Sequence, residues 1–230
     1  MKWFSFFTFI LFSFTVQSQS DTTITMEAKT CCPDGKYYSN IVAVGGKYIF
    51  SSMTKTRNTL SDNGFILNEE AIEYQLRFYN LPKLYYFQQL GTLNASNYAS
   101  VIGLGLKEDF RLPLLKDKVV ELTPYIEVGG GYYMLNIIKG VSHNSMSTVL
   151  DSQIENYFMD NFTATADIGL DLGFTFHIGS SKIGIVANGG YILNYPTEWR
   201  LAGSLAFSDK MDISSPYVGF TVKLEKPCCN

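Results

Sequence analysis

The feature that most constrains this chain is a long alternation of apolar residues with polar or small ones. In ADIGLDLGFTFHIGS, residues 166–180, every second residue from Ile168 to Ile178 is apolar, and those between are polar or small. Successive side chains of a β-strand point to opposite faces of the sheet, so the pattern predicts a strand with one apolar face. Six apolar residues on one face are many for a soluble sheet and typical of a strand that crosses a membrane.

Seven further segments can form strands of this kind, three with clear alternation and four with a weaker one. The eight predicted strands cover residues 40–51, 71–79, 83–90, 100–112, 121–135, 166–180, 182–195 and 215–224. Beyond the first twenty residues, no stretch approaches the roughly 18 consecutive apolar residues of a membrane-spanning helix. We therefore expect an all-β fold, a single eight-stranded antiparallel transmembrane β-barrel.

Composition agrees with a barrel in a membrane. Aromatic residues make up 15% of the chain and charged residues 17%, whereas about 25% of a soluble domain is charged. The formal net charge is −3 and the chain has no basic run, so nothing indicates a nucleic-acid partner.

The N-terminus has the pattern of a secretory signal. One lysine is followed by an apolar run from Trp3 to Val16 and by small residues near Ser18. The apolar run is too short for a good membrane anchor. We expect residues 1–18 to be a signal peptide, 19–39 a periplasmic segment, 40–226 the barrel and 227–230 a periplasmic tail.

Short and long connections alternate between the predicted strands. The short ones lie near residues 80–83, 114–118 and 179–182, and the longer ones cover 52–70, 91–98, 138–161 and 196–213. Outer-membrane barrels have short periplasmic turns and long external loops, so both termini are expected on the periplasmic side. The first long segment can hold a short helix ending at Asn63-Gly64. The 138–161 loop can hold an amphipathic turn through Val149, Leu150, Ile154, Tyr157 and Phe158.

With its signal peptide, its alternating strands and a last strand at 217–224 like a closing strand, the chain resembles the small eight-stranded outer-membrane β-barrels of Gram-negative bacteria. The resemblance covers nearly all of the mature chain. It implies an outer-membrane location, contact with outer-membrane lipid and insertion by the barrel-assembly machinery. Because its motifs specify no ligand, we expect a non-enzymatic structural or binding subunit of a membrane complex. A protein partner would use the external loops or the lateral face.

All four cysteines lie in two doublets near the ends of the chain, Cys31-Cys32 and Cys228-Cys229. Closing the barrel brings the first and last strands together at the periplasmic rim, where disulfides can form and persist. We therefore expect one or two disulfides across this seam, and the sequence does not choose between the two connectivities that cross it. A four-thiolate metal site, bonds to another protein and free thiols are the alternatives.

The alternation directs ten charged side chains into the barrel. The five cations and five anions are Lys47, Arg77, Lys107, Arg111 and Lys223, and Glu73, Asp109, Glu127, Asp167 and Asp171. The interior of an eight-stranded barrel is just wide enough for side chains to fill, and buried charges require partners. We expect a charge-balanced plug; a gated ion path that makes the protein a small channel is the alternative.

Signs of catalysis are weak. His143 lies in a loop with Ser142, Ser145 and Asp151, so a membrane-embedded lipid-modifying hydrolase is an alternative. His177 alternates toward the lumen near a turn, most simply as part of the polar network or the rim. A soluble lipocalin-like carrier is a further alternative, but its apolar face would point inward. The sequence has no phosphate-binding or paired-histidine motif, and we predict no catalytic, cofactor or metal site.

Overall fold

The structure is a computed structural model that describes residues 38–78, 81–93, 97–112, 114–116, 120–140, 155–178, 181–201 and 205–227. The chain divides into one unit of Met1–Tyr38 with Pro227–Asn230 and a second unit, Ser39–Lys226, which is the barrel. The predicted signal peptide, the predicted periplasmic segment and both cysteine doublets lie outside the described residues, apart from the end of that segment at 38–39.

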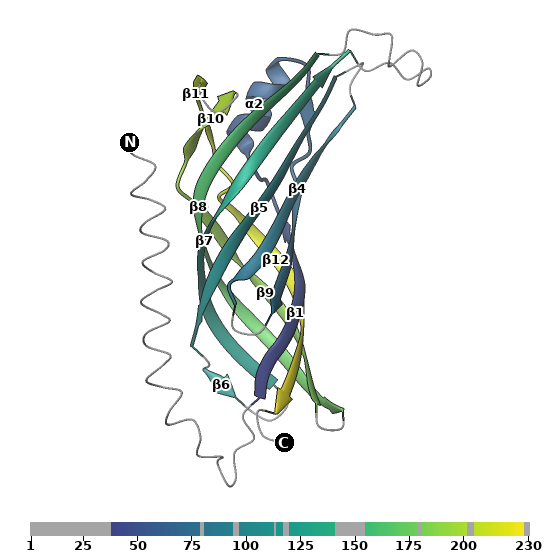
Figure 1. Ribbon diagram of the computed structural model, residues 1–230, viewed down its shortest axis with the longest axis vertical. Coiled ribbons are helices and arrows are strands. Elements are labelled where there is room, and N and C mark those ends of the chain that lie inside the picture. The colour runs from purple at the N-terminus through teal and green to yellow at the C-terminus, as the bar shows by residue number, and fades with distance from the viewer. Residues whose placement is uncertain are drawn as a thin grey trace. The chain divides into compact units, whose positions relative to one another are not determined.

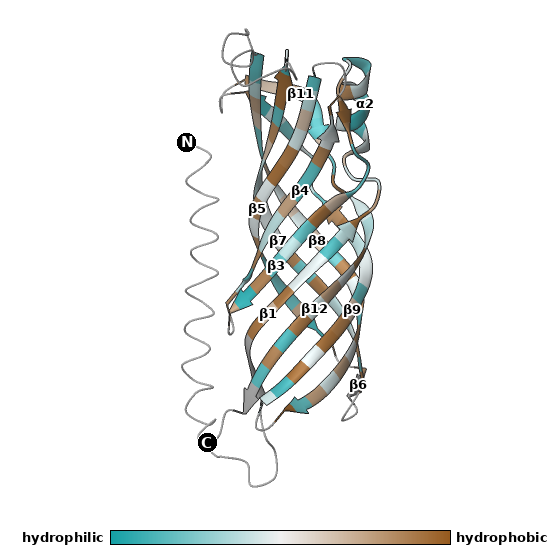
Figure 2. Ribbon diagram, turned by 90° about the vertical axis from the view of Figure 1, so that its right-hand side faces the viewer, coloured by the Kyte–Doolittle hydropathy of each residue, from teal (hydrophilic) through white to brown (hydrophobic). Residues whose placement is uncertain are grey.

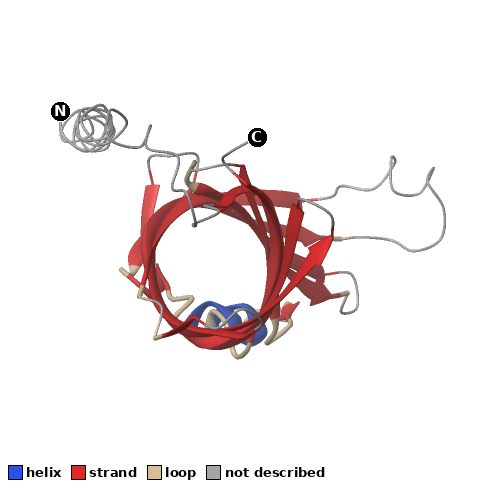
Figure 3. Ribbon diagram, turned by 90° about the horizontal axis from the view of Figure 1, so that it is seen from below, coloured by secondary structure: helices blue, strands red, loops and turns tan. Residues whose placement is uncertain are grey.

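Eight strands of the described chain form a closed ring (Figures 1 and 3). They are β1 (Tyr38–Ile49), β3 (Ala71–Phe78), β4 (Lys83–Thr92), β5 (Asn97–Arg111), β7 (Val120–Lys139), β8 (Glu155–Ile178), β9 (Ser181–Asn194) and β12 (Ser215–Pro227). Each strand pairs antiparallel with the next, and β12 lies beside β1. The predicted single eight-stranded antiparallel barrel is confirmed, and each predicted strand corresponds to one of these eight.

The alternation in the sequence becomes the two faces of the barrel wall. On β8, Ile168 is 51% exposed on the outer face, whereas its neighbour Asp167 is fully buried on the inner face. The same alternation of buried and exposed positions continues along β4 and β7, and Figure 2 shows apolar and polar residues following one another along the strands. The outside of the ring is therefore apolar, and the interior holds the polar and charged side chains together with a core of buried apolar ones.

β7 and β8 are longer than predicted. β8 has 24 residues, more than twice the 9–11 that cross a bilayer. Its outward side chains are apolar from Phe162 to Ile178, and the next outward residue is Asp160. Tyr157 and Phe158, expected in a loop, lie on β8 opposite β7, so that expectation was wrong. The rest of the predicted turn, Val149, Leu150 and Ile154, lies outside the described residues.

Two further elements lie at this end of the barrel (Figure 1). Helix α2 (Thr54–Asp62) ends at Asn63, and Gly64 has a left-handed φ of 81°, which confirms the predicted helix and its end. Residues 196–213, expected as a loop, contain the hairpin of β10 (Thr197–Leu201) and β11 (Leu205–Met211), and β10 pairs with β8.

Two short strands complete the wall. β2 (Ile66–Leu67) pairs with β4, and β6 (Leu115–Lys116) pairs with β7. Within the part of the chain that the structure describes, none of the helices has the length and hydropathy to cross a membrane.

Candidate functional site: the ion-paired barrel interior

Six buried charges fill the middle of the barrel and form what we call the central cluster. Three lysines and three carboxylates, contributed by six different strands, make it up: Lys47, Lys83, Lys107, Glu73, Glu127 and Asp167. All six are at most 8% exposed. Because each residue comes from the inner face of its strand, the cluster follows directly from the period of two in the sequence.

Lys47 on β1 is the most connected cation of the central cluster. Its Nζ donates to Asp167 Oδ2 at 2.5 Å and to Glu127 Oε2 at 2.7 Å, and it lies 3.9 Å from Glu73 Oε1. It also lies 4.5 Å from the ring centroid of Tyr217 on β12, within reach of a cation–π interaction. The Lys47 ammonium therefore connects β1 to its neighbours β3 and β12 and to β7 and β8 across the barrel.

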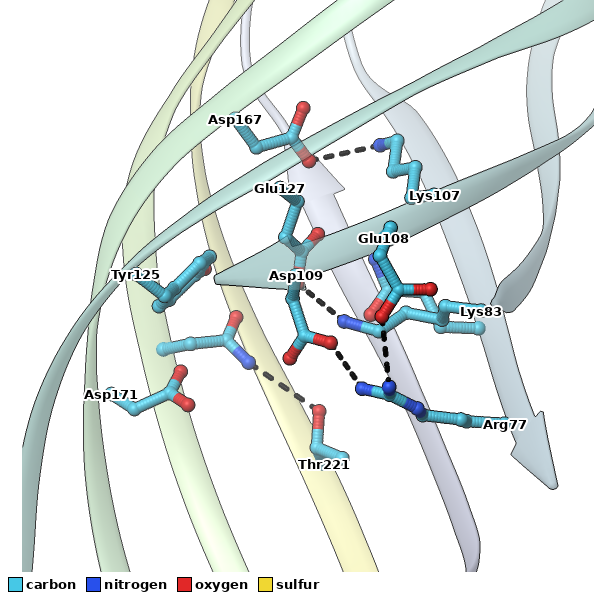
Figure 4. A network of polar contacts seen from close by, with 12 residues as sticks. Arg77, Lys83, Lys107, Glu108, Asp109, Tyr125, Glu127, Asp167, Asp171 and Thr221 are labelled. Atoms are coloured by element: carbon cyan, nitrogen blue, oxygen red, sulfur yellow. Dashed lines mark hydrogen bonds and ion pairs between the residues drawn. The ribbon is translucent and has the colours of Figure 1, made fainter. Parts of the chain in front are cut away.

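The other two lysines complete the charge balance. Lys107 Nζ donates to both carboxylate oxygens of Glu73 at 2.8 and 2.9 Å and to Asp167 Oδ2 at 2.9 Å. Figure 4 shows Lys107 directed at Asp167. Lys83 donates to Glu127 Oε1. Buried charges are tolerated only when they are paired and hydrogen-bonded, and every member of the cluster meets this condition.

A second group of charges, the arginine layer, lies next to the central cluster. It consists of Arg77, Arg111, Glu108, Asp109 and Asp171. Asp109 bridges the two guanidinium groups, Arg111 also pairs with Asp171, and Arg77 Nη2 lies 3.1 Å from Glu108 Oε1. The pairs of Arg77 with Asp109 and Glu108 are visible in Figure 4.

Aromatic side chains fill the interior beside the charges. The Tyr85 and Tyr133 hydroxyls are hydrogen-bonded at 3.0 Å, and the ring of Phe87 packs edge-on against Tyr133. A Cβ at Gly131 would lie 2.1 Å from the Tyr85 hydroxyl oxygen, so a residue without a side chain is needed there. Gly131 therefore makes room for the buried ring of Tyr85.

The paired charges fill the middle of the barrel, a region where an unpaired charge would be poorly solvated. The ion pairs connect six strands of the barrel, β1, β3, β4, β5, β7 and β8, across its interior. Within the described residues the site offers no group of three His, Cys, Asp or Glu side chains that could hold a metal ion.

The structure places the ten charges predicted for the lumen on the inner face, and all but Lys223 take part in these ion pairs. Lys223 is half-buried near the end of β12 and has no ion pair among the described residues. Sequence reasoning missed Lys83 and Glu108. The outward Leu84 and Tyr86 carry a signal for Lys83, because alternation from them turns Lys83 inward; we found no such signal for Glu108.

The residues of the predicted hydrolase cannot be placed. His143, Ser142, Ser145 and Asp151 lie outside the described residues. His177 lies opposite Lys182 near the end of β8 and is exposed. The cysteines predicted to join the seam also lie outside the described part of the chain.

No protein-family model and no curated protein sequence matches the chain. A search of solved structures matches the chain to the N-terminal β-barrel domain of OprF from Pseudomonas aeruginosa. The match has 10% sequence identity and a TM-score of 0.30, and it covers 81% of this chain and 98% of the OprF domain.

Proposed function

We propose that this chain spans the outer membrane of a Gram-negative bacterium and acts there, without catalysis, as a structural or binding subunit of a membrane complex. The observation that carries the proposal is the apolar outer face of a closed barrel. Residues such as Val44, Leu104 and Val218, on three different strands, are each more than half exposed. In water such a face would aggregate, whereas a closed ring leaves no unpaired strand edge in lipid.

The apolar face is long enough to cross a bilayer. On β8 the outward residues are apolar for 17 positions, from Phe162 to Ile178. This is more than the 9–11 residues that a tilted strand needs. Phe162, Phe174 and Phe176 lie toward the ends of the face, as the aromatic girdles of outer-membrane barrels do. Asp160 then marks the point where the strand would leave the lipid.

The interior supports a non-conducting role. The central cluster and the arginine layer fill the lumen with paired charges, and loops or the lateral face are left as surfaces for a partner. We propose that the short connections and both termini face the periplasm, because α2 and the β10–β11 hairpin lie at the opposite end of the barrel. The barrel-assembly machinery would insert the chain from that side.

Two measurements test this proposal. In native membranes, the protein should sediment with the outer membrane and need detergent for extraction, and chemical crosslinking followed by purification should recover a stoichiometric protein partner. In planar bilayers, the purified protein should give no current steps. Extraction without detergent would refute the membrane assignment. Regular conductance steps altered by Arg111→Ser, with Arg200→Ser on β10, outside the arginine layer, as control, would instead establish a channel.

A further inference from the structure

A pocket of about 400 Å³ lies in the mouth of the barrel, at the end that carries α2 and the β10–β11 hairpin. This volume is at the small end of the roughly 300–1,000 Å³ range of small-molecule sites. The part of β8 that contributes to it, Glu155–Met159, precedes Asp160 and so lies beyond the apolar outer band. Molecules dissolved outside the membrane can therefore reach this mouth pocket without crossing the lipid.

The body of the mouth pocket is apolar. Six side chains from five different parts of the fold form most of it: Leu60, Phe65, Leu135, Met159, Trp199 and Phe207. Trp199 is 2% exposed and belongs to the hydrophobic core of the barrel interior. A largely preformed apolar cavity with a few polar groups is the usual form of a small-molecule site.

The side-chain N–H donors in the body of the pocket form hydrogen bonds with other groups of the protein. Trp199 Nε1 donates to Thr56 Oγ1 at 3.3 Å, and Asn63 Nδ2 donates to the Thr59 carbonyl at 2.8 Å. The first bond joins α2 to the hairpin, the second lies at the C-terminal end of α2, and both use donors that could otherwise select a polar ligand. Selection within the pocket body therefore depends on apolar contact.

The rim of the mouth pocket is charged and carries an excess of carboxylates. Lys139 Nζ and Glu155 Oε2 lie 3.9 Å apart across the β7–β8 pair. Asp209 on β11 is exposed and has no ion pair among the described residues. One ammonium thus stands against two carboxylates, and Tyr157 adds an aromatic ring at the same rim. A cationic group at this place gains from Asp209 and from the ring face.

We propose that the mouth pocket binds a compact apolar molecule with a cationic end, the apolar part between α2 and β7 and the cation at Asp209. This assigns a ligand class to the mouth of the barrel at α2, separate from the ion-paired interior. It does not depend on which partner the barrel has in the membrane.

The binding test uses the fluorescence of Trp199. The chain has two tryptophans, Trp3 and Trp199, so in a Trp3→Phe background Trp199 is the sole emitter under excitation at the red edge of the tryptophan band. The protein is held in phosphatidylcholine nanodiscs and titrated with hexyltrimethylammonium or with hexanoate. We expect a saturable change in Trp199 emission with the cation, and at most a linear change from lipid partitioning with the anion.

Matched variants locate the site. Ile137 lines the pocket and its neighbour Ile138 points to the opposite face of β7, so Ile137→Tyr should abolish the saturable change and Ile138→Tyr should leave it. Asp209→Asn should weaken the apparent affinity roughly two- to fivefold, the size expected of one exposed ion pair. Asp62→Asn, an exposed carboxylate on α2 outside the pocket, should have no effect.

Several results would overturn the proposal: no saturable change with hexyltrimethylammonium, an equal saturable change with hexanoate, or an unaltered response in Ile137→Tyr. Each variant is first required to keep the heat-dependent mobility shift of a folded barrel on a denaturing gel. If Ile137→Tyr does not fold, two comparisons still decide: Asp209→Asn against Asp62→Asn, and hexyltrimethylammonium against hexanoate. Neither comparison changes a residue of the eight-stranded wall.

Discussion

Replacing Lys47 with methionine tests whether the central cluster stabilises the barrel. Methionine keeps much of the lysine stem and removes the ammonium that lies 2.5 Å from Asp167 and 2.7 Å from Glu127. The cluster then holds three carboxylates against two lysines, all in a place where side chains are at most 8% exposed. Leaving a buried charge without its partner costs about 3–5 kcal/mol, and we expect a loss of this size in the free energy of unfolding.

A second change should return part of that loss. In the Lys47→Met, Asp167→Asn double variant, Lys107 still pairs with Glu73 at 2.8 Å and Lys83 still pairs with Glu127. Two cations then face two anions, and no carboxylate lacks a lysine. The double variant should therefore be more stable than Lys47→Met alone, by roughly 0.5–3 kcal/mol, the range of coupling energies between residues in one network.

The assay is reversible unfolding in urea in detergent micelles, followed by tryptophan fluorescence and by the gel shift of the folded barrel. Lys55→Met, on the exposed face of α2, serves as the control for loss of a lysine and should change the unfolding free energy by less than about 0.5 kcal/mol. The reasoning is refuted if Lys47→Met costs less than about 1 kcal/mol, or if adding Asp167→Asn lowers stability further.

Three other predictions concern packing, lipid contact and the seam. Gly131→Ala should destabilise the barrel by about 1–3 kcal/mol in the same urea assay, because its Cβ would meet the buried Tyr85 hydroxyl; Gly189→Ala, where a Cβ finds ordinary contact at 3.6 Å, should cost clearly less, and equal losses would contradict this. Ile168→Arg should cost about 2–4 kcal/mol in lipid vesicles if this residue lies near the bilayer midplane; an unchanged stability would place it outside the lipid. Peptide mapping of the unreduced protein should link the two cysteine doublets, and free thiols or bonds within each doublet would exclude a seam disulfide.

The period of two was sufficient to predict the wall of the barrel between its two rims. On β8, Ile168 and Asp167 belong to opposite faces because successive side chains of a strand alternate between the apolar outside and the filled interior. The same rule turned Lys47 and Glu127 inward before their contacts were known. Where one face of a strand is consistently apolar and the other consistently polar or small, the sequence therefore predicts the strand and the residues that face the lumen.

The rule weakens beyond the apolar band, which is why the ends of β7 and β8 were missed. There the outward Asn136 and Asp160 are polar, while the inward Leu135 and Met159 are apolar and line the mouth pocket. At these positions the polar residues point outward and the apolar ones inward, the opposite of the alternation along the rest of the wall. A search for strands with outward apolar residues therefore assigns these segments to loops. The β10–β11 hairpin escaped for the same reason, since it lies wholly at this end.

The central claim, that the outer face of the barrel contacts lipid, is tested most directly by quenching with brominated phospholipids. Single tryptophans are placed at Ala164, Ile168 and Leu172 on the outer face of β8 in a Trp3→Phe, Trp199→Phe background, and the buried Trp199 in a Trp3→Phe background is the internal control. The account predicts strong quenching at the three β8 positions, strongest for bromines at the acyl-chain depth of the middle position, and little quenching of Trp199. Equal, weak quenching at all four positions would contradict a barrel that spans the bilayer.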